Sequence, residues 1–308
     1  PNVHNHAFDD IVVEREMETL KQRIHSIKDD KMQYANMRLI DEMCKGEPYS
    51  LHVHGYEEDL TEINGKDLYE YYQKMMKEDE LDIYVLGDFN EGKMKELIQS
   101  TVKREKVDAQ DRSKVKRVNH QVEPKEVIEK QNVQQAKLHI GYRTYVSFKD
   151  DDYFALQVFN GIFGGFPNSK LFINVREKNS LAYYAASRME SHKGLLFVFS
   201  GIAPEDFEKA RDIIREQLVA MKNGDFTEEN LQETKDLIIN QIKETIDNSQ
   251  GMIEILYQQV VGEKEMTLGE LLNGINAVTK EQVMKVADNI EEDTVYLLTN
   301  EGGQNSAS

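Results

Sequence analysis

A stretch of mixed charge that is poor in large apolar residues divides the sequence into two unequal parts. It runs from residue 103 to residue 130 and includes charged clusters at residues 103–106 and 112–117. A segment of this composition cannot bury a hydrophobic face, and such segments typically connect domains. The 308 residues are enough for about two domains. We therefore expect a first domain at residues 1–105, a linker at 106–124, a second domain at 125–303 and a tail at 304–308.

The part before the linker has mainly the apolar spacing of amphipathic helices. This spacing predicts helices over residues 8–27 and 32–46, with Asp29 and Asp30 ending one and starting the next. A third helix is expected over residues 61–76 and a short one over 91–102. Between them, residues 81–86 alternate and then become wholly apolar, which predicts a strand.

The part after the linker contains a longer series of strands and helices. Two strands are expected first, then a helix over residues 153–163 that ends at Gly164 and Gly165, where glycine permits close packing. The other expected elements are a helix at 169–175, antiparallel strands at 182–190 and 194–203, helices at 204–223, 227–246, 266–275 and 279–289, and a strand at 294–299. The first part resembles the closing half of this series. A duplicated α+β domain whose first copy lacks its opening strands explains both parts.

The charge balance excludes several classes of partner. There are 56 acidic and 38 basic side chains, which gives a net charge of −18. A chain this acidic gains nothing from counterion release on a phosphate backbone, so we expect no nucleic acid and no anionic membrane surface as partner. No apolar run reaches the roughly 18 residues of a membrane span, and no signal peptide is visible. The single cysteine, Cys44, is expected to be a buried, inert thiol, which favours a cytoplasmic location.

Histidine pairs are the first candidates for a metal site. His4 and His6 form one pair, and His52 and His54 form the other. Neither pair has a third ligand at a recognisable interval, so we interpret both as solvated or hydrogen-bonded side chains. No HExxH or HxxEH run occurs in the 308 residues, so a helical zinc site with a built-in general base is absent from them.

The segment SKLFINVREKNSLAYY, residues 169–184, combines a helix end with the start of a strand. Arg176 can present a rigid fork of donors to a peptide carbonyl or carboxylate. Tyr183 offers a phenolic donor that can stabilise an oxyanion. The alternative is structural: Arg176 pairs with Glu177 or another acid, and Tyr183 packs in the sheet.

This segment closely resembles the second-domain signature of pitrilysin-type zinc peptidases, which include insulin-degrading enzyme and the mitochondrial processing peptidase. The run IYVLGDF at residues 83–89 resembles the corresponding part of the first domain, and the similarity extends over nearly the whole chain. Residues 29–55 further resemble the elongation factor P 5-aminopentanol modification-associated proteins, in particular the group without the zinc motif.

The resemblance implies two α+β rolls, each a mainly antiparallel sheet with helices on one face, of the LuxS and processing-peptidase type. It implies that the first roll is incomplete here, because the HxxEH motif would lie before Pro1. In the family, a distal glutamate ligand follows an ERE run by seven residues. Here Glu14, Arg15 and Glu16 are followed by Arg23, and a guanidinium cannot coordinate zinc.

The resemblance thus implies a non-catalytic, peptide-binding subunit of a heteromeric zinc peptidase. It would supply Arg176 and Tyr183 to the zinc site of a paralogous partner, and would itself hold no cofactor. Two alternatives stay open. One is a self-sufficient zinc endopeptidase whose metal motif lies in the missing N-terminal part, and the other is an inactive scaffold.

Overall fold

The computed structural model of the chain describes residues 3–4, 6–104 and 122–300. They form two compact units: Pro1–Asp29 with His52–His120, and Asp30–Leu51 with Gln121–Ser308. Most of the predicted linker and the whole predicted tail, 304–308, lie outside the described residues. Residues 30–51 thus belong to the second compact unit. The predicted boundaries 1–105 and 125–303 refer to duplicated domains and not to compact units, and they stay a prediction.

The first unit consists mainly of helices. It contains β1 (Val3–His4), β2 (Ala7–Phe8), α1 (Asp10–Asp29), the short 3-10 helix η2 (Glu57–Glu62), α3 (Gly65–Glu78) and α4 (Glu91–Thr101). Phe8 packs edge-on against Tyr69 and Tyr72 of α3, with ring centroids 5.4 and 5.7 Å apart. Glu57 joins η2 to α1 through His25, 2.6 Å away, and Lys21, 3.2 Å away. The four helices predicted between residues 8 and 102 are confirmed: α1, α3 and α4 here, and α2 in the second unit.

The strand predicted at residues 81–86 is wrong. These residues belong to no strand, and Leu81, Ile83 and Val85 are each more than 40 % exposed. A strand needs a neighbour for its backbone hydrogen bonds. Among the described residues of the first unit, only the two-residue strands β1 and β2 pair with each other. Residues 81–86 therefore have the alternating pattern of a strand but pair with no strand of the described residues.

The second unit is built on a five-stranded sheet in the order β3-β7-β4-β6-β5. The strands are β3 (Lys125–Lys130), β4 (Ala136–Arg143), β5 (Ala182–Glu190), β6 (Leu195–Ile202) and β7 (Glu291–Thr299). Only the β3–β7 pair is parallel, whereas the three other pairs are antiparallel. The mainly antiparallel α+β fold class expected from the sequence is confirmed.

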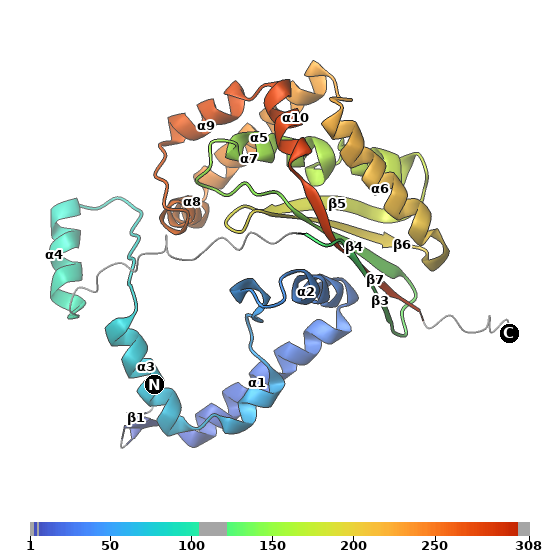
Figure 1. The fold of residues 1–308 in the computed structure, drawn as a ribbon. Coiled ribbons are helices and arrows are strands. Elements are labelled where there is room, and N and C mark those ends of the chain that lie inside the picture. Colours follow the sequence, from blue (N-terminus) through green and yellow to red (C-terminus); the bar gives the residue numbers. More distant parts are fainter. Residues whose placement is uncertain (1–2, 5, 105–121, 301–308) are drawn as a thin grey trace. The chain divides into compact units, whose positions relative to one another are not determined.

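Helices cover one face of this sheet (Figure 1). They are α5 (Tyr153–Asn160), α6 (Phe207–Lys222), α7 (Glu228–Asp247), α8 (Ser249–Val261), α9 (Leu268–Ala277) and α10 (Lys280–Asp288), with π-helical segments η4 (Gly161–Gly165) and η5 (Phe172–Glu177) after α5 and a 3-10 turn η6 (Pro204–Asp206) before α6. The main core lies between helices and sheet, and includes Leu138, Ile140, Phe159 and Ile214. Gly164 is confirmed as a close-packing position: a Cβ there would lie 2.7 Å from the backbone nitrogen of Ser187 in β5.

The opposite face of the sheet is covered by α2 (Lys31–Met43), followed by the 3-10 turn η1 (Pro48–Ser50) (Figure 1). Strand residues alternate between the two faces, so Val198 belongs to the main core while Phe197 packs with Ala35 and Leu39 of α2. A Cβ on Gly141 would lie 2.5 Å from the sulfur of Met43, so a larger residue there would force the side chain of Met43 to move. The amphipathic face predicted for residues 32–46 is thus buried on the sheet of the second unit.

Two further expectations concern burial. Cys44 is fully buried beside α2, and burial raises the pKa of its thiol to about 12, as expected for an inert thiol. Within the described part of the chain, no helix has both the length and the apolar character needed to cross a bilayer.

Candidate substrate-contact site

The predicted Arg176 and Tyr183 lie at either side of the turn that joins η5 to β5. Val175 and Leu181 are buried and anchor the two sides. The backbone nitrogen of Leu181 donates to the carbonyl of Val175 at 3.1 Å, which closes the turn. The side-chain amide of Asn179 also donates to the carbonyl of Asn174, at 2.7 Å. The end of η5 and the start of β5 are therefore held beside each other.

Arg176 is exposed and has no ion pair with any described residue. Its guanidinium carbon lies 4.7 Å from the ring centroid of Phe172, one turn earlier on the same segment. A guanidinium stacked on a ring face keeps its edge donors available for other groups. The alternative in which Arg176 pairs with Glu177 is not what the structure shows.

Tyr183 occupies an irregularity of the sheet. The register of β5 against β6 shifts between Ala182, opposite Ile202, and Tyr184, opposite Gly201. An extra residue in a bulge is left unpaired and its side chain is turned away from the regular alternation. Tyr183 is 73 % exposed, so the alternative in which it packs in the sheet is wrong.

No metal centre is found in the residues that the structure describes, because none of their His, Cys, Asp and Glu side chains form a group of three suited to a cation. His52 lies against the ring of Tyr56 at 4.6 Å between centroids. Arg23, at the position that the resemblance gives to a zinc ligand, is an exposed residue of α1. Among the described residues, Arg176 and Tyr183 are therefore exposed on either side of one turn, and no such group of three lies beside them.

Sequence reasoning missed two buried polar positions on the sheet face that α2 covers. The Arg143 guanidinium contacts the carboxylates of Asp293 at 2.9 Å and Glu47 at 2.7 Å, and the carbonyl of Met43 at 2.8 Å. His139 is fully buried, and neither of its ring nitrogens has a hydrogen-bond partner among the described residues. The signal in the sequence is weak, because β4 also contains Lys137 and Arg143 is the last residue of the strand.

Comparison with known proteins decides the family. The model of the "Peptidase M16 inactive domain" matches residues 62–238, more than half of the chain. The chain belongs to the M16 peptidase family. It is 50 % identical over 298 residues to the Bacillus subtilis protein named "Probable inactive metalloprotease YmfF", covering 97 % of this chain and 70 % of that protein.

Solved structures of other proteins share the fold. A conserved protein from Enterococcus faecalis V583 superposes with a TM-score of 0.86 at 34 % identity, over 99 % of this chain and 72 % of that one. A protease from Helicobacter pylori superposes with a TM-score of 0.83 at 18 % identity, over 94 % and 73 % of the two chains, and this likeness bears on the fold alone.

These matches confirm that the chain is a pitrilysin-type family member with a metallopeptidase-like fold and without the zinc motif in its sequence. It is an inactive M16-family metalloprotease homologue.

Proposed function

We propose that this M16 homologue is the non-catalytic, peptide-binding subunit of a heteromeric zinc peptidase. In this proposal a paralogous M16 partner carries the zinc, and Arg176 and Tyr183 of this chain contact the peptide held there. A connection to elongation factor P modification stays a prediction from the sequence.

The observation that carries the proposal is the availability of both side chains. In the second unit, four arginines pair with carboxylates, namely Arg38, Arg143, Arg211 and Arg215, whereas Arg176 and Arg188 have no ion pair with a described residue. Arg176 has no such pair among the described residues and is held only by the ring of Phe172. A free, positioned guanidinium is suited to a peptide carbonyl or a terminal carboxylate.

Tyr183 supports the same function. An exposed tyrosine on a regular strand could be incidental, but this one lies in a bulge, where the backbone departs from its regular pairing. Its hydroxyl has no partner among the described residues and can donate to an oxygen that gains negative charge during peptide cleavage. The contact between Val175 and Leu181 fixes the turn beneath it, so the backbone that carries Tyr183 is held in place before a substrate arrives.

The test is peptide cleavage by the full-length protein purified together with a zinc-motif-bearing M16 paralogue of the same organism. Arg176→Ala is expected to lower kcat/KM by about 10- to 100-fold, because a charge-assisted hydrogen bond to the substrate is lost. Tyr183→Phe, which removes only the hydroxyl, is expected to lower it by about 10-fold.

Arg188→Ala is the matched control. Arg188 is an exposed arginine of the same strand as Tyr183, and its guanidinium also lies over a phenylalanine ring, 5.7 Å from that of Phe199. It should leave kcat/KM unchanged. If the complex of the Arg176→Ala variant with its paralogue keeps full activity, the proposed role is refuted. If Arg188→Ala lowers kcat/KM by the same factor, the loss is a general effect of surface charge.

A further inference from the structure

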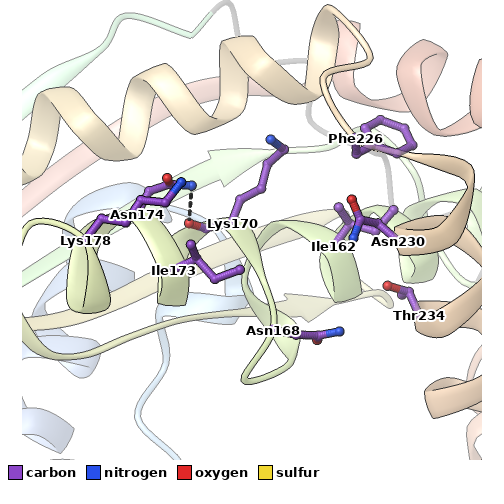
Figure 2. A pocket seen from close by; sticks show the side chains of 9 residues that line it. All are labelled: Ile162, Asn168, Lys170, Ile173, Asn174, Lys178, Phe226, Asn230 and Thr234. Carbon is purple, nitrogen blue, oxygen red and sulfur yellow. Dashed lines mark hydrogen bonds between the residues drawn. The ribbon is translucent and has the colours of Figure 1, made fainter.

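A pocket of about 170 Å³ lies on the helical side of the second unit, and neither Arg176 nor Tyr183 lines it (Figure 2). One wall is formed by the segment from Ile162 to Lys178, and the other by the loop and first turns of α7, from Phe226 to Thr234. A single water needs roughly 10–15 Å³ on this measure. The pocket can therefore hold a molecule of several non-hydrogen atoms.

The charge of the lining is positive in a strongly acidic chain. Lys170 and Lys178 line the pocket and no acidic residue does, although the whole chain has a net charge of −18. The ammonium of Lys170 lies 3.5 Å from the carboxylate of Asp225, whose side chain is 80 % exposed and whose attraction is screened by solvent. Lys178 has no ion pair with a described residue. An anionic group in the pocket would thus be attracted by the ammonium groups of Lys170 and Lys178, and no buried carboxylate would compete with it for them.

Neutral donors with unused hydrogen-bonding capacity add to this charge. Thr234 is only 3 % exposed, and its hydroxyl has no hydrogen-bond partner among the described residues. Its methyl group packs against Gly161, where a Cβ would lie 2.4 Å from it. The side-chain oxygen of Asn230 accepts from the backbone nitrogen of Thr227 at 3.1 Å, which leaves the amide NH₂ of Asn230 unused. A bound acceptor can take hydrogen bonds from the hydroxyl of Thr234 and from the amide of Asn230.

The remaining lining is apolar. Ile162, Ile173 and Phe226 contribute hydrocarbon surface to the same pocket (Figure 2). Inorganic phosphate would leave this surface without a contact, whereas an organic acid would cover it. Small-molecule sites typically combine an apolar lining with a few polar groups that fix the ligand's orientation.

We propose that this pocket binds a small organic carboxylate with a branched or aromatic body of about four to eight carbon atoms, a size set by the volume of the pocket. Lys170 and Lys178 supply the charge, and Asn230 and Thr234 supply neutral donors. Ile162, Ile173 and Phe226 contact the hydrocarbon. Lys170, Asn174 and Lys178 are spaced by four residues, which places them on one face of a helical segment. This spacing is the feature of the sequence that corresponds to one wall of the pocket.

The experiment is a ligand-observed NMR titration of the full chain with isovalerate, its neutral isostere isovaleramide, and inorganic phosphate. Isovalerate is expected to bind in the millimolar range, in keeping with its few non-hydrogen atoms, and isovaleramide at least about 10-fold more weakly. Lys170→Met and Thr234→Val are each expected to weaken isovalerate binding by about 10-fold. Lys178→Met should also weaken isovalerate binding, because it removes a positive charge from the pocket. Since Lys178 is exposed, this substitution should not disturb folding.

Lys209→Met, an exposed lysine of α6 outside the pocket, is the control and should leave binding unchanged. Equal binding of isovalerate and isovaleramide, binding of phosphate alone, or unchanged binding in both Lys178→Met and Thr234→Val would overturn the proposal. Because the readout is binding and needs no partner subunit, the outcome is independent of the proposed peptidase role.

Discussion

Replacing Arg143 with methionine is expected to lower the free energy of unfolding by about 3–5 kcal/mol. Arg143 is 8 % exposed and contacts two carboxylates and one backbone carbonyl within 2.9 Å. The substitution would leave the carboxylates of Asp293 and Glu47 charged and poorly solvated, without the cation that each contacts in the wild type. Since Glu47 and Met43 belong to the segment at the end of α2, the loss should also free that segment from the sheet. Urea unfolding followed by far-ultraviolet circular dichroism measures the free energy.

Two further variants separate the ion pair from the loss of any arginine. Arg15→Met removes a solvent-exposed pair with Glu16, 3.5 Å apart, and should cost less than about 1 kcal/mol. Adding Asp293→Asn and Glu47→Gln to Arg143→Met should restore part of the stability, because no unpaired charge then remains. An Arg143→Met protein as stable as the wild type would show that α2 is not fixed to the sheet in this way.

The protein is also expected to become less stable as the pH decreases, because His139 is buried in its neutral form. Burial, followed by repulsion from Lys137, lowers the pKa of His139 from 6.5 to about 3 in the folded chain. The unfolded chain therefore binds a proton below pH 6.5 that the folded chain rejects. The stability is fully present above the unfolded value and is lost as the pH falls. From pH 8 to pH 5 this single group should cost about 2 kcal/mol.

His139→Leu is expected to remove this part of the pH dependence, so its advantage over the wild type should grow by about 2 kcal/mol from pH 8 to pH 5. Phe199→Leu is the matched control. Phe199 contacts the imidazole edge-on at 5.0 Å between centroids and does not titrate, so its substitution should change stability by the same amount at every pH. A constant difference between His139→Leu and the wild type would mean that His139 takes up its proton without unfolding.

Local signals in the sequence predicted the elements of the second unit well. Asp30 does begin α2, with its carboxylate accepting from the backbone nitrogens of Met32 and Gln33. The helix expected at residues 227–246 is α7, and Thr227 and Asn230 form a capping box at its start. The hairpin of β5 and β6 was predicted to within one residue at each end, because alternating apolar residues flank a short polar turn.

What the sequence did not reveal depends on partners distant along the chain. The pattern of α2 shows an apolar face but not which sheet that face covers. Residues 81–86 have the alternation of a strand, yet no strand of the described residues pairs with them. Helix α8 was missed: Gly251, a poor helix former, lies in its first turn, and none of its residues is buried in the structure. The pocket beside Lys170 was missed for the same reason as α2: its second wall comes from residues about 55 positions later.

The most direct test of the central claim is the zinc content and peptidase activity of the full-length protein, alone and with a zinc-motif-bearing M16 paralogue. The protein alone is expected to bind no stoichiometric zinc and to cleave no peptide, whereas the purified pair should hold one zinc and cleave. One tightly bound zinc per chain together with cleavage by the protein alone would contradict the division of labour proposed for Arg176 and Tyr183, and would establish a self-sufficient endopeptidase instead.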